Sequence, residues 1–276
     1  MSWGRRHAPA PLKKQSFLSL PSTPRLRRFR QLAFHTSLLG LFACETEPAT
    51  KQVETASRSK LAEAPASATP KPELPPEFEI DTVSTKVGFE RALLQNPEGR
   101  AKLKSLLGEA KKWVDGKDVV LTVNRKVKVP WVAAYLDELG KLTPAKVMIR
   151  TETRKDYSPE LRFTPEAKAE APACSVVGMV TSDYGTAVWK LTGGAAGKRG
   201  RGMAGPDLSM TGDTIERLGK ACPESSSFFV AVADGIEWGL AYDLAASSRM
   251  LERVKFEEAV LLGQTPVPGH KVALQR

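Results

Sequence analysis

The three histidines have the widest catalytic use of any side chains in this 276-residue sequence, and none falls in a segment that we expect to fold. His7 and His35 lie in an N-terminal leader, and His270 lies in a C-terminal tail. We therefore expect no histidine general base, no Ser-His-Asp triad and no His-rich zinc site in the folded segments. Nothing else in the sequence indicates a metal ion or a cofactor, so we expect neither, and we predict a protein that is not an enzyme.

The cysteines indicate a structural bond rather than a reaction. Apart from Cys44, the chain contains only Cys174 and Cys222. In an oxidising compartment this pair predicts a disulfide, and two buried free thiols are the alternative. A cysteine nucleophile is not expected, because no histidine is available as its partner.

Two carboxylates, Asp234 and Glu237, are close enough in sequence to be considered as an acid–base pair. They follow directly on the apolar run 228–233, which favours a structural role instead. We expect Asp234 to cap the following helix and Glu237 to lie in its first turn.

A Gly-rich, basic segment at 193–202 resembles a phosphate-binding loop only superficially. Thr192 stands where the first glycine of that motif is needed, and Arg199 stands where a serine or threonine should bind magnesium. We predict a mobile loop. Its cations, Lys198, Arg199 and Arg201, are candidates for contact with an anionic glycan, lipid headgroups or an acidic partner.

The elements around these groups show an internal repeat. An apolar strand at 228–233 ends in an Asp-Gly turn, and a similar strand at 119–123 ends in a polar loop. Each is followed by a helix with the same Trp-x-x-Ala-Tyr spacing. We interpret these aromatic side chains as packing determinants, whereas an exposed one would favour a protein or glycan contact. The repeat determinants are Trp131, Ala134, Tyr135, Asp234, Trp238, Ala241 and Tyr242.

The hydrophobic periodicity predicts an α/β fold. Residues 78–165 are expected to form strand, helix, strand, helix, strand. Residues 172–276 are expected to form a hairpin, a short helix capped by Asp213, then strand, helix, strand and an extended tail. We therefore predict two tandem small two-layer modules. Each has a short mixed sheet in β-β-α-β-α-β or β-α-β-α-β order, with helices on one face.

The charge distribution points to a targeting segment rather than to nucleic acid. The net charge is +10, but residues 1–43 hold eight of the 41 basic residues and no acidic one. We therefore expect no nucleic-acid partner. The apolar run 31–43 is too short to span a bilayer. We predict a lipoprotein-type signal peptide at 1–43 and a disordered, Pro- and Ala-rich tether at 44–77.

The signal peptide ends in Leu41-Phe42-Ala43-Cys44, which resembles the bacterial lipobox. The resemblance implies that Cys44 is lipidated and that the protein is in the cell envelope. It would then be periplasmic and anchored to the inner or outer membrane. An ordinary cleaved signal peptide and a buried N-terminal helix are the alternatives.

Residues 230–239, VAVADGIEWG, resemble the strand, acidic turn and helix start of the ExbD/TolR periplasmic domain, and residues 123–131 are a looser copy. The resemblance implies two tandem copies of that domain. It also implies a non-enzymatic role in biopolymer transport, through an ExbB/TolQ-like or TonB/TolA-like protein or through peptidoglycan, with a homodimer as one assembly. The transmembrane helix of that family has no counterpart in the sequence. The alternative is a general periplasmic polymer-binding or scaffold lipoprotein with no link to a proton-driven motor.

Overall fold

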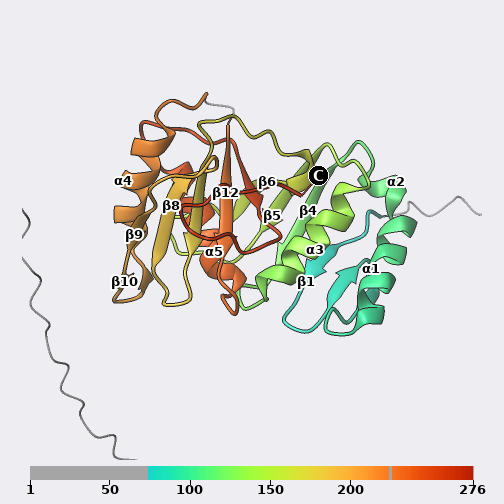
Figure 1. Ribbon diagram of the computed structural model, residues 1–276. Coiled ribbons are helices and arrows are strands. Elements are labelled where there is room, and N and C mark those ends of the chain that lie inside the picture. Colours follow the sequence, from blue (N-terminus) through green and yellow to red (C-terminus); the bar gives the residue numbers. More distant parts are fainter. Residues whose placement is uncertain (1–73, 224–225, 276) are drawn as a thin grey trace, which may run out of the picture. The chain divides into compact units, whose positions relative to one another are not determined.

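The computed structural model describes residues 74–223 and 226–275 (Figure 1). Their main feature is an eleven-stranded mixed sheet in the order β3-β2-β1-β4-β5-β6-β13-β12-β7-β8-β9, and β10 and β11 form a separate two-stranded ribbon. The strands are β1 (Phe78–Ile80), β2 (Thr85–Val87), β3 (Glu90–Ala92), β4 (Asp118–Val123), β5 (Lys146–Arg150), β6 (Glu160–Thr164), β7 (Val176–Val180), β8 (Thr186–Lys190), β9 (Gly197–Arg199), β10 (Arg201–Gly202), β11 (Gly205–Pro206), β12 (Ser227–Val232) and β13 (Glu258–Leu261).

The helices follow the apolar stripes of the sequence. Proline occupies one of the first two positions of α1 and α3, where its missing N–H is not needed. None of the helices in the described residues is long and apolar enough to cross a membrane. The helices are α1 (Pro97–Glu109), α2 (Lys111–Val114), α3 (Val129–Gly140), the short 3₁₀ helix η1 (Glu166–Lys168), α4 (Leu208–Gly219) and α5 (Trp238–Arg249).

The prediction of two separate small modules is wrong, because β6 joins both halves into one sheet. This strand pairs antiparallel with β5 on one side and parallel with β13 on the other. Leu161 and Phe163 are buried between more polar neighbours, as expected of a strand with one face on the core. Without β6, β5 and β13 would each present an unpaired edge. All described residues fall in one compact unit.

The two halves of this sheet nevertheless have the same order of elements. The first runs β3-β2-β1-β4-β5 across the sheet and the second runs β9-β8-β7-β12-β13. In each half the first three strands form an antiparallel meander, and the remaining two are parallel to the first. The outermost strands, β3 and β9, are short additions that the sequence pattern did not indicate.

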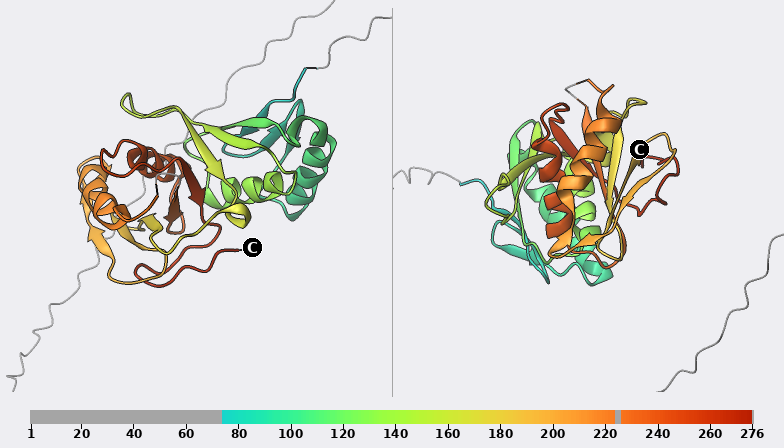
Figure 2. Two further views of the ribbon diagram at one scale, coloured as in Figure 1. Left: turned by 90° about the horizontal axis from the view of Figure 1, so that it is seen from above. Right: turned by 90° about the vertical axis from the view of Figure 1, so that its left-hand side faces the viewer.

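The sheet separates two apolar clusters. In β12, Phe228 and Val230 belong to the larger cluster, which includes side chains from α1, α3, α4 and α5. Phe229 and Ala231 face the other way, into a smaller cluster that contains no helix side chain. The C-terminal tail covers this second cluster with Val272 and Leu274. The Nε1–H of Trp189 donates to the carbonyl oxygen of His270 in this tail at 2.9 Å. Figure 2 shows the path of the tail, coloured dark red.

Two local predictions in the second half are also wrong. The helix α4 begins at Leu208, and its N-cap is Asp207, whose Oδ1 accepts the N–H of Met210 at 3.2 Å. Asp213 therefore lies inside this helix rather than at its start. The Gly-rich segment is not a simple loop, because Gly197–Arg199 pairs antiparallel with β8 and the residues after it form the β10–β11 ribbon.

Candidate functional site

The aromatic residues of the repeat differ in their exposure. Tyr135, Trp238 and Tyr242 are completely buried, and so is Ala241. Trp131 is only partly buried and lies on the outer side of α3, as does the partly buried Ala134. The packing interpretation therefore describes three of the four aromatic side chains, and Trp131 is the exception.

The buried aromatic residues of α5 pack against the first half and β6. The Trp238 ring lies 5.4 Å from the ring of Phe163 and 5.8 Å from that of Tyr242, between ring centroids. Trp238 Nε1–H donates to the Thr151 hydroxyl at 2.8 Å, and the Tyr242 hydroxyl donates to the carbonyl oxygen of Ser158 at 3.0 Å. These contacts orient α5 across the junction of the two halves.

The corresponding tyrosine of the first half has a different environment. Within the described part of the chain, the Tyr135 hydroxyl has no hydrogen-bond partner. Burial raises the pKa of Tyr135 far above that of an exposed tyrosine. Burial also raises the pKa of Tyr242, although its hydroxyl is hydrogen-bonded.

An ion pair between a buried carboxylate and a half-buried arginine lies at the same junction and was not predicted from the sequence. Arg125 donates to both carboxylate oxygens of Asp243, at 3.0 and 2.8 Å, and also to the carbonyl oxygens of Glu152 and Gly239. The hydrogen bond to Asp243 is the main reason that the pKa of Arg125 is raised. A β-carbon at Gly239 would lie 2.9 Å from Arg125 Nε and 3.1 Å from its Cβ, so a larger residue there would displace the Arg125 side chain. A charged residue directly after the buried Tyr242 was the available signal.

The first turn of α5 is capped by backbone, so the predicted Asp234 cap is wrong. The N–H groups of Trp238 and Gly239 donate to the carbonyl oxygens of Val127 and Arg125, each at 2.8 Å. The N-cap residue is Glu237, and its side chain makes no capping bond. Asp234 is exposed in the preceding turn. Because loop 124–128 of the first half supplies the acceptors, no carboxylate is needed there.

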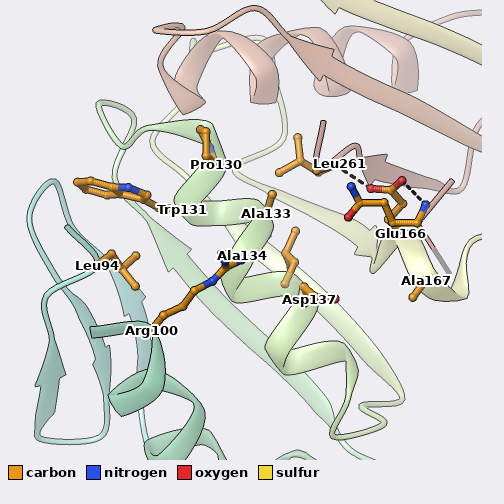
Figure 3. Close-up of a pocket in the computed structure, with 13 residues that line it drawn as sticks. Leu94, Arg100, Pro130, Trp131, Ala133, Ala134, Asp137, Glu166, Ala167 and Leu261 are labelled. Carbon is orange, nitrogen blue, oxygen red and sulfur yellow. Dashed lines mark hydrogen bonds between the residues drawn. The ribbon is translucent and has the colours of Figure 1, made fainter. Parts of the chain in front are cut away.

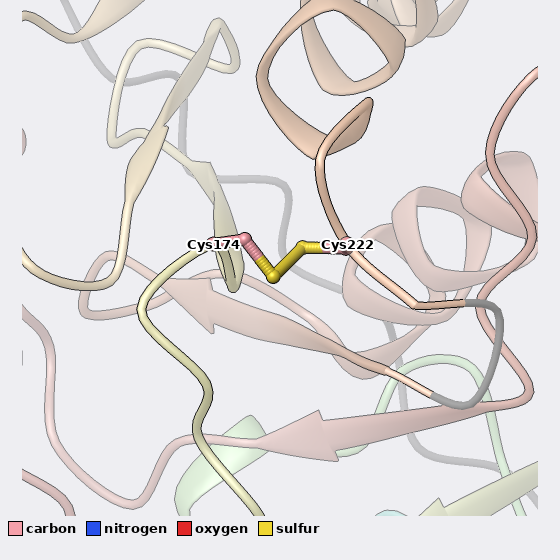
Figure 4. Close-up of a disulfide and its surroundings, with 2 residues drawn as sticks. All are labelled: Cys174 and Cys222. Carbon is pink, nitrogen blue, oxygen red and sulfur yellow. A yellow bond between two sulfur atoms is a disulfide. The ribbon is translucent and has the colours of Figure 1, made fainter.

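The predicted disulfide is confirmed. The sulfur atoms of Cys174 and Cys222 are within bonding distance, and their Cα atoms are 5.3 Å apart (Figure 4). The bond joins the segment before β7 to the turn that follows α4. Cys44, the predicted lipidation site, lies outside the described residues, as do the signal peptide and the tether as far as residue 73.

The predicted anion-contact residues lie together at one edge of the sheet. Lys198 and Arg199 belong to β9 and Arg201 to β10, and all three are exposed. The Arg201 guanidinium lies over the Tyr184 ring, 5.1 Å from its centroid. Contact of these three side chains with an anion stays a prediction.

Trp131 lies in a groove along the outer surface of α3, which we call the α3 groove (Figure 3). Its volume is about 390 Å³. The floor is formed by Pro130, Ala133 and Ala134 of α3. One wall contains Leu94 and Arg100, and the opposite wall contains Glu166 and Ala167 with residues of the C-terminal tail. The remaining lining residues are Leu136, Asp137, Leu261, Gly263 and Gln275.

The charged groups of the α3 groove have different kinds of partner. Asp137 pairs with Lys141 at 3.1 Å. Glu166 uses both carboxylate oxygens to accept the backbone N–H groups of Gly263 and Gln275, each at 2.8 Å. The Arg100 side chain makes no hydrogen bond or ion pair with any residue in 74–223 or 226–275.

Among the described residues, no group of three or more His, Cys, Asp or Glu side chains could hold a metal ion. The chain matches no family model, no curated protein and no solved structure.

Proposed function

We propose that this chain is a non-enzymatic binding protein of the bacterial cell envelope that holds a partner in the α3 groove. The partner is an envelope protein or peptidoglycan. A lipid on Cys44 and the tether that follows it would keep the folded part close to a membrane. The resemblance to ExbD/TolR periplasmic domains and a role in biopolymer transport belong to this proposal, as does the alternative of a scaffold lipoprotein without a motor.

One observation carries the proposal, namely the position of Trp131. The other three repeat aromatics are completely buried, whereas Trp131 lines a groove. Ligand sites are typically concave, and they are lined by aromatic side chains with a few polar groups. Tryptophan and arginine are also the residues most often found to dominate binding energy at protein interfaces. The disulfide supports export, because such bonds persist in oxidising compartments.

The test compares Trp131→Ala with Trp113→Ala in the full chain. Trp113 is also partly exposed, but it lies on α2 and does not line the α3 groove. Binding is measured as co-sedimentation with isolated peptidoglycan and as co-purification with ExbB/TolQ-like and TonB/TolA-like proteins. We expect Trp131→Ala alone to reduce one of these signals. Equal binding by both variants, with unchanged thermal stability, would show that the groove is not the binding site.

A further inference from the structure

The edge of the sheet at β9 combines exposed cations with an apolar tip. Lys198, Arg199 and Arg201 are exposed there, on the side of the sheet farthest from α1 in Figure 1. Met203 lies in the turn between β10 and β11 and is fully exposed, at 104%. No described residue therefore covers its side chain. We call these four residues the β9 edge.

The charge of this region is positive after its carboxylates are included. Residues 183–207 contain four basic residues against two acidic ones, a formal net charge of +2. Asp183 interacts electrostatically with Lys198, and Asp207 is the N-cap of α4, next to the positive end of the helix dipole. Neither Arg199 nor Arg201 forms an ion pair within residues 74–223 and 226–275. These two cations are free to meet an anion.

The apolar tip decides which anionic partner fits this edge. A glycan that contacted the cations would leave Met203 in water, and an acidic protein would need a pocket matched to it. A lipid surface needs no matched shape, because its headgroups meet the cations while an apolar side chain gains from burial at the acyl boundary. Tyr184, which lies under the Arg201 guanidinium and is 42% exposed, adds an amphipathic ring of the kind that suits such a boundary.

We infer that the β9 edge rests on an anionic lipid surface, with its cations at the headgroups and Met203 at the acyl boundary. The excess charge is small, so the contact is weak for a free chain. It suffices for a chain that is already anchored to the same membrane, because the second contact is then intramolecular. The inference therefore rests on the lipid anchor of the proposed function, and it adds the orientation of the folded part towards the membrane.

The experiment follows methionine oxidation in the full chain. With Cys174 and Cys222 in the disulfide, Cys44 is the free thiol of the sequence, and it is coupled to a maleimide lipid in phosphatidylcholine vesicles with or without phosphatidylglycerol. Sulfoxide formation by peroxide is measured by mass spectrometry at Met203 and, as an internal reference, at Met250, which is 55% exposed. Phosphatidylglycerol should slow the oxidation of Met203 about 5-fold and leave Met250 unchanged.

Charge reversal tests the role of the cations. Arg199→Glu/Arg201→Glu should abolish the protection of Met203, whereas Lys104→Glu/Lys111→Glu, at exposed positions of α1 and α2, should preserve it. Equal oxidation of Met203 on both kinds of vesicle would overturn the inference, and so would protection that survives the reversal of both arginines. Protection by soluble polyglutamate but not by vesicles would overturn it in favour of an acidic partner.

Failure of this inference and failure of the proposed function are distinguishable. Coupling at Cys44 supplies the anchor, so a negative result on vesicles concerns the β9 edge alone. The comparison of Trp131→Ala with Trp113→Ala concerns the α3 groove alone, because neither residue belongs to the β9 edge.

Discussion

The ion pair between Arg125 and Asp243, which connects the two halves, should contribute strongly to the free energy of unfolding. Asp243 is 1% exposed, and beyond Arg125 its nearest cation is Arg154, with Nε at 3.6 Å. Arg125→Ala would leave this carboxylate buried with only that longer contact. Removing one partner of a buried pair costs about 3–5 kcal/mol. Because Arg154 stays near this carboxylate, we expect the free energy of unfolding to fall by the lower end of that range, about 3 kcal/mol.

The reverse substitution should cost less. The Arg125 side chain is 28% exposed, and without Asp243 it would still donate to the carbonyl oxygens of Glu152 and Gly239. We therefore expect Asp243→Ala to reduce the free energy of unfolding by about 1–3 kcal/mol. In the double variant the two costs should not add, and the interaction energy of the cycle should be about 1–3 kcal/mol.

The assay is urea unfolding of the full chain, followed by far-ultraviolet circular dichroism with the disulfide intact. Lys141→Ala is the matched control, because its ion pairs with Asp137 and Glu138 are near the surface and should contribute less than about 1 kcal/mol. The reasoning is refuted if Arg125→Ala costs no more than Lys141→Ala. Simple additivity in the double variant would refute it as well.

Four further results are expected. Reduction of Cys174–Cys222, which are 48 residues apart, should lower the free energy of unfolding by about 4 kcal/mol, measured by urea unfolding with and without reductant. Because one sheet joins both halves, each of these unfolding curves should show a single transition, and two would contradict the shared sheet. Tyr242→Phe should cost about 1–2 kcal/mol through its lost hydrogen bond, whereas Tyr135→Phe, which removes an unpartnered hydroxyl, should be neutral or stabilising. Both tyrosines have raised pKa values in the folded state, so the stability that depends on their being protonated is complete below about pH 10 and is lost as the pH rises further. The tyrosinate absorbance of these two residues, taken as the difference between the protein and its Tyr135→Phe/Tyr242→Phe double variant, should therefore appear together with unfolding rather than before it.

Local patterns in the sequence were sufficient for several features. The helix α3 and the strand β12 follow from apolar periodicity. The matching Trp-x-x-Ala-Tyr spacings indicated a repeat, and the two halves have the same order of elements. The cysteine count indicated the disulfide, because two cysteines in one region of a chain that is predicted to be exported have few alternatives.

The joining of the halves could not be predicted in the same way. The strand β6 alternates buried and more polar residues, but its pairing with β13 involves residues almost 100 positions away in the chain. The Asp234 cap was wrong for a similar reason. Local capping rules predict that a side chain near the helix start accepts the first N–H groups of the helix. In α5 the acceptors of these N–H groups are instead the carbonyl oxygens of Val127 and Arg125 in the other half.

The sequence also determined only part of the candidate site. The sequence by itself determined which residues carry the repeat, and Trp131 was among them. Its repeat partner Trp238 is buried because α5 packs against β6 and the 124–128 loop, whereas Trp131 faces outward on α3. Identical spacing on two helices sets the same local geometry, but exposure depends on what packs against each helix. Only the tertiary structure therefore decided that Trp131 lines a groove, that Arg100 is left without a partner beside it, and that Asp243 is buried against Arg125.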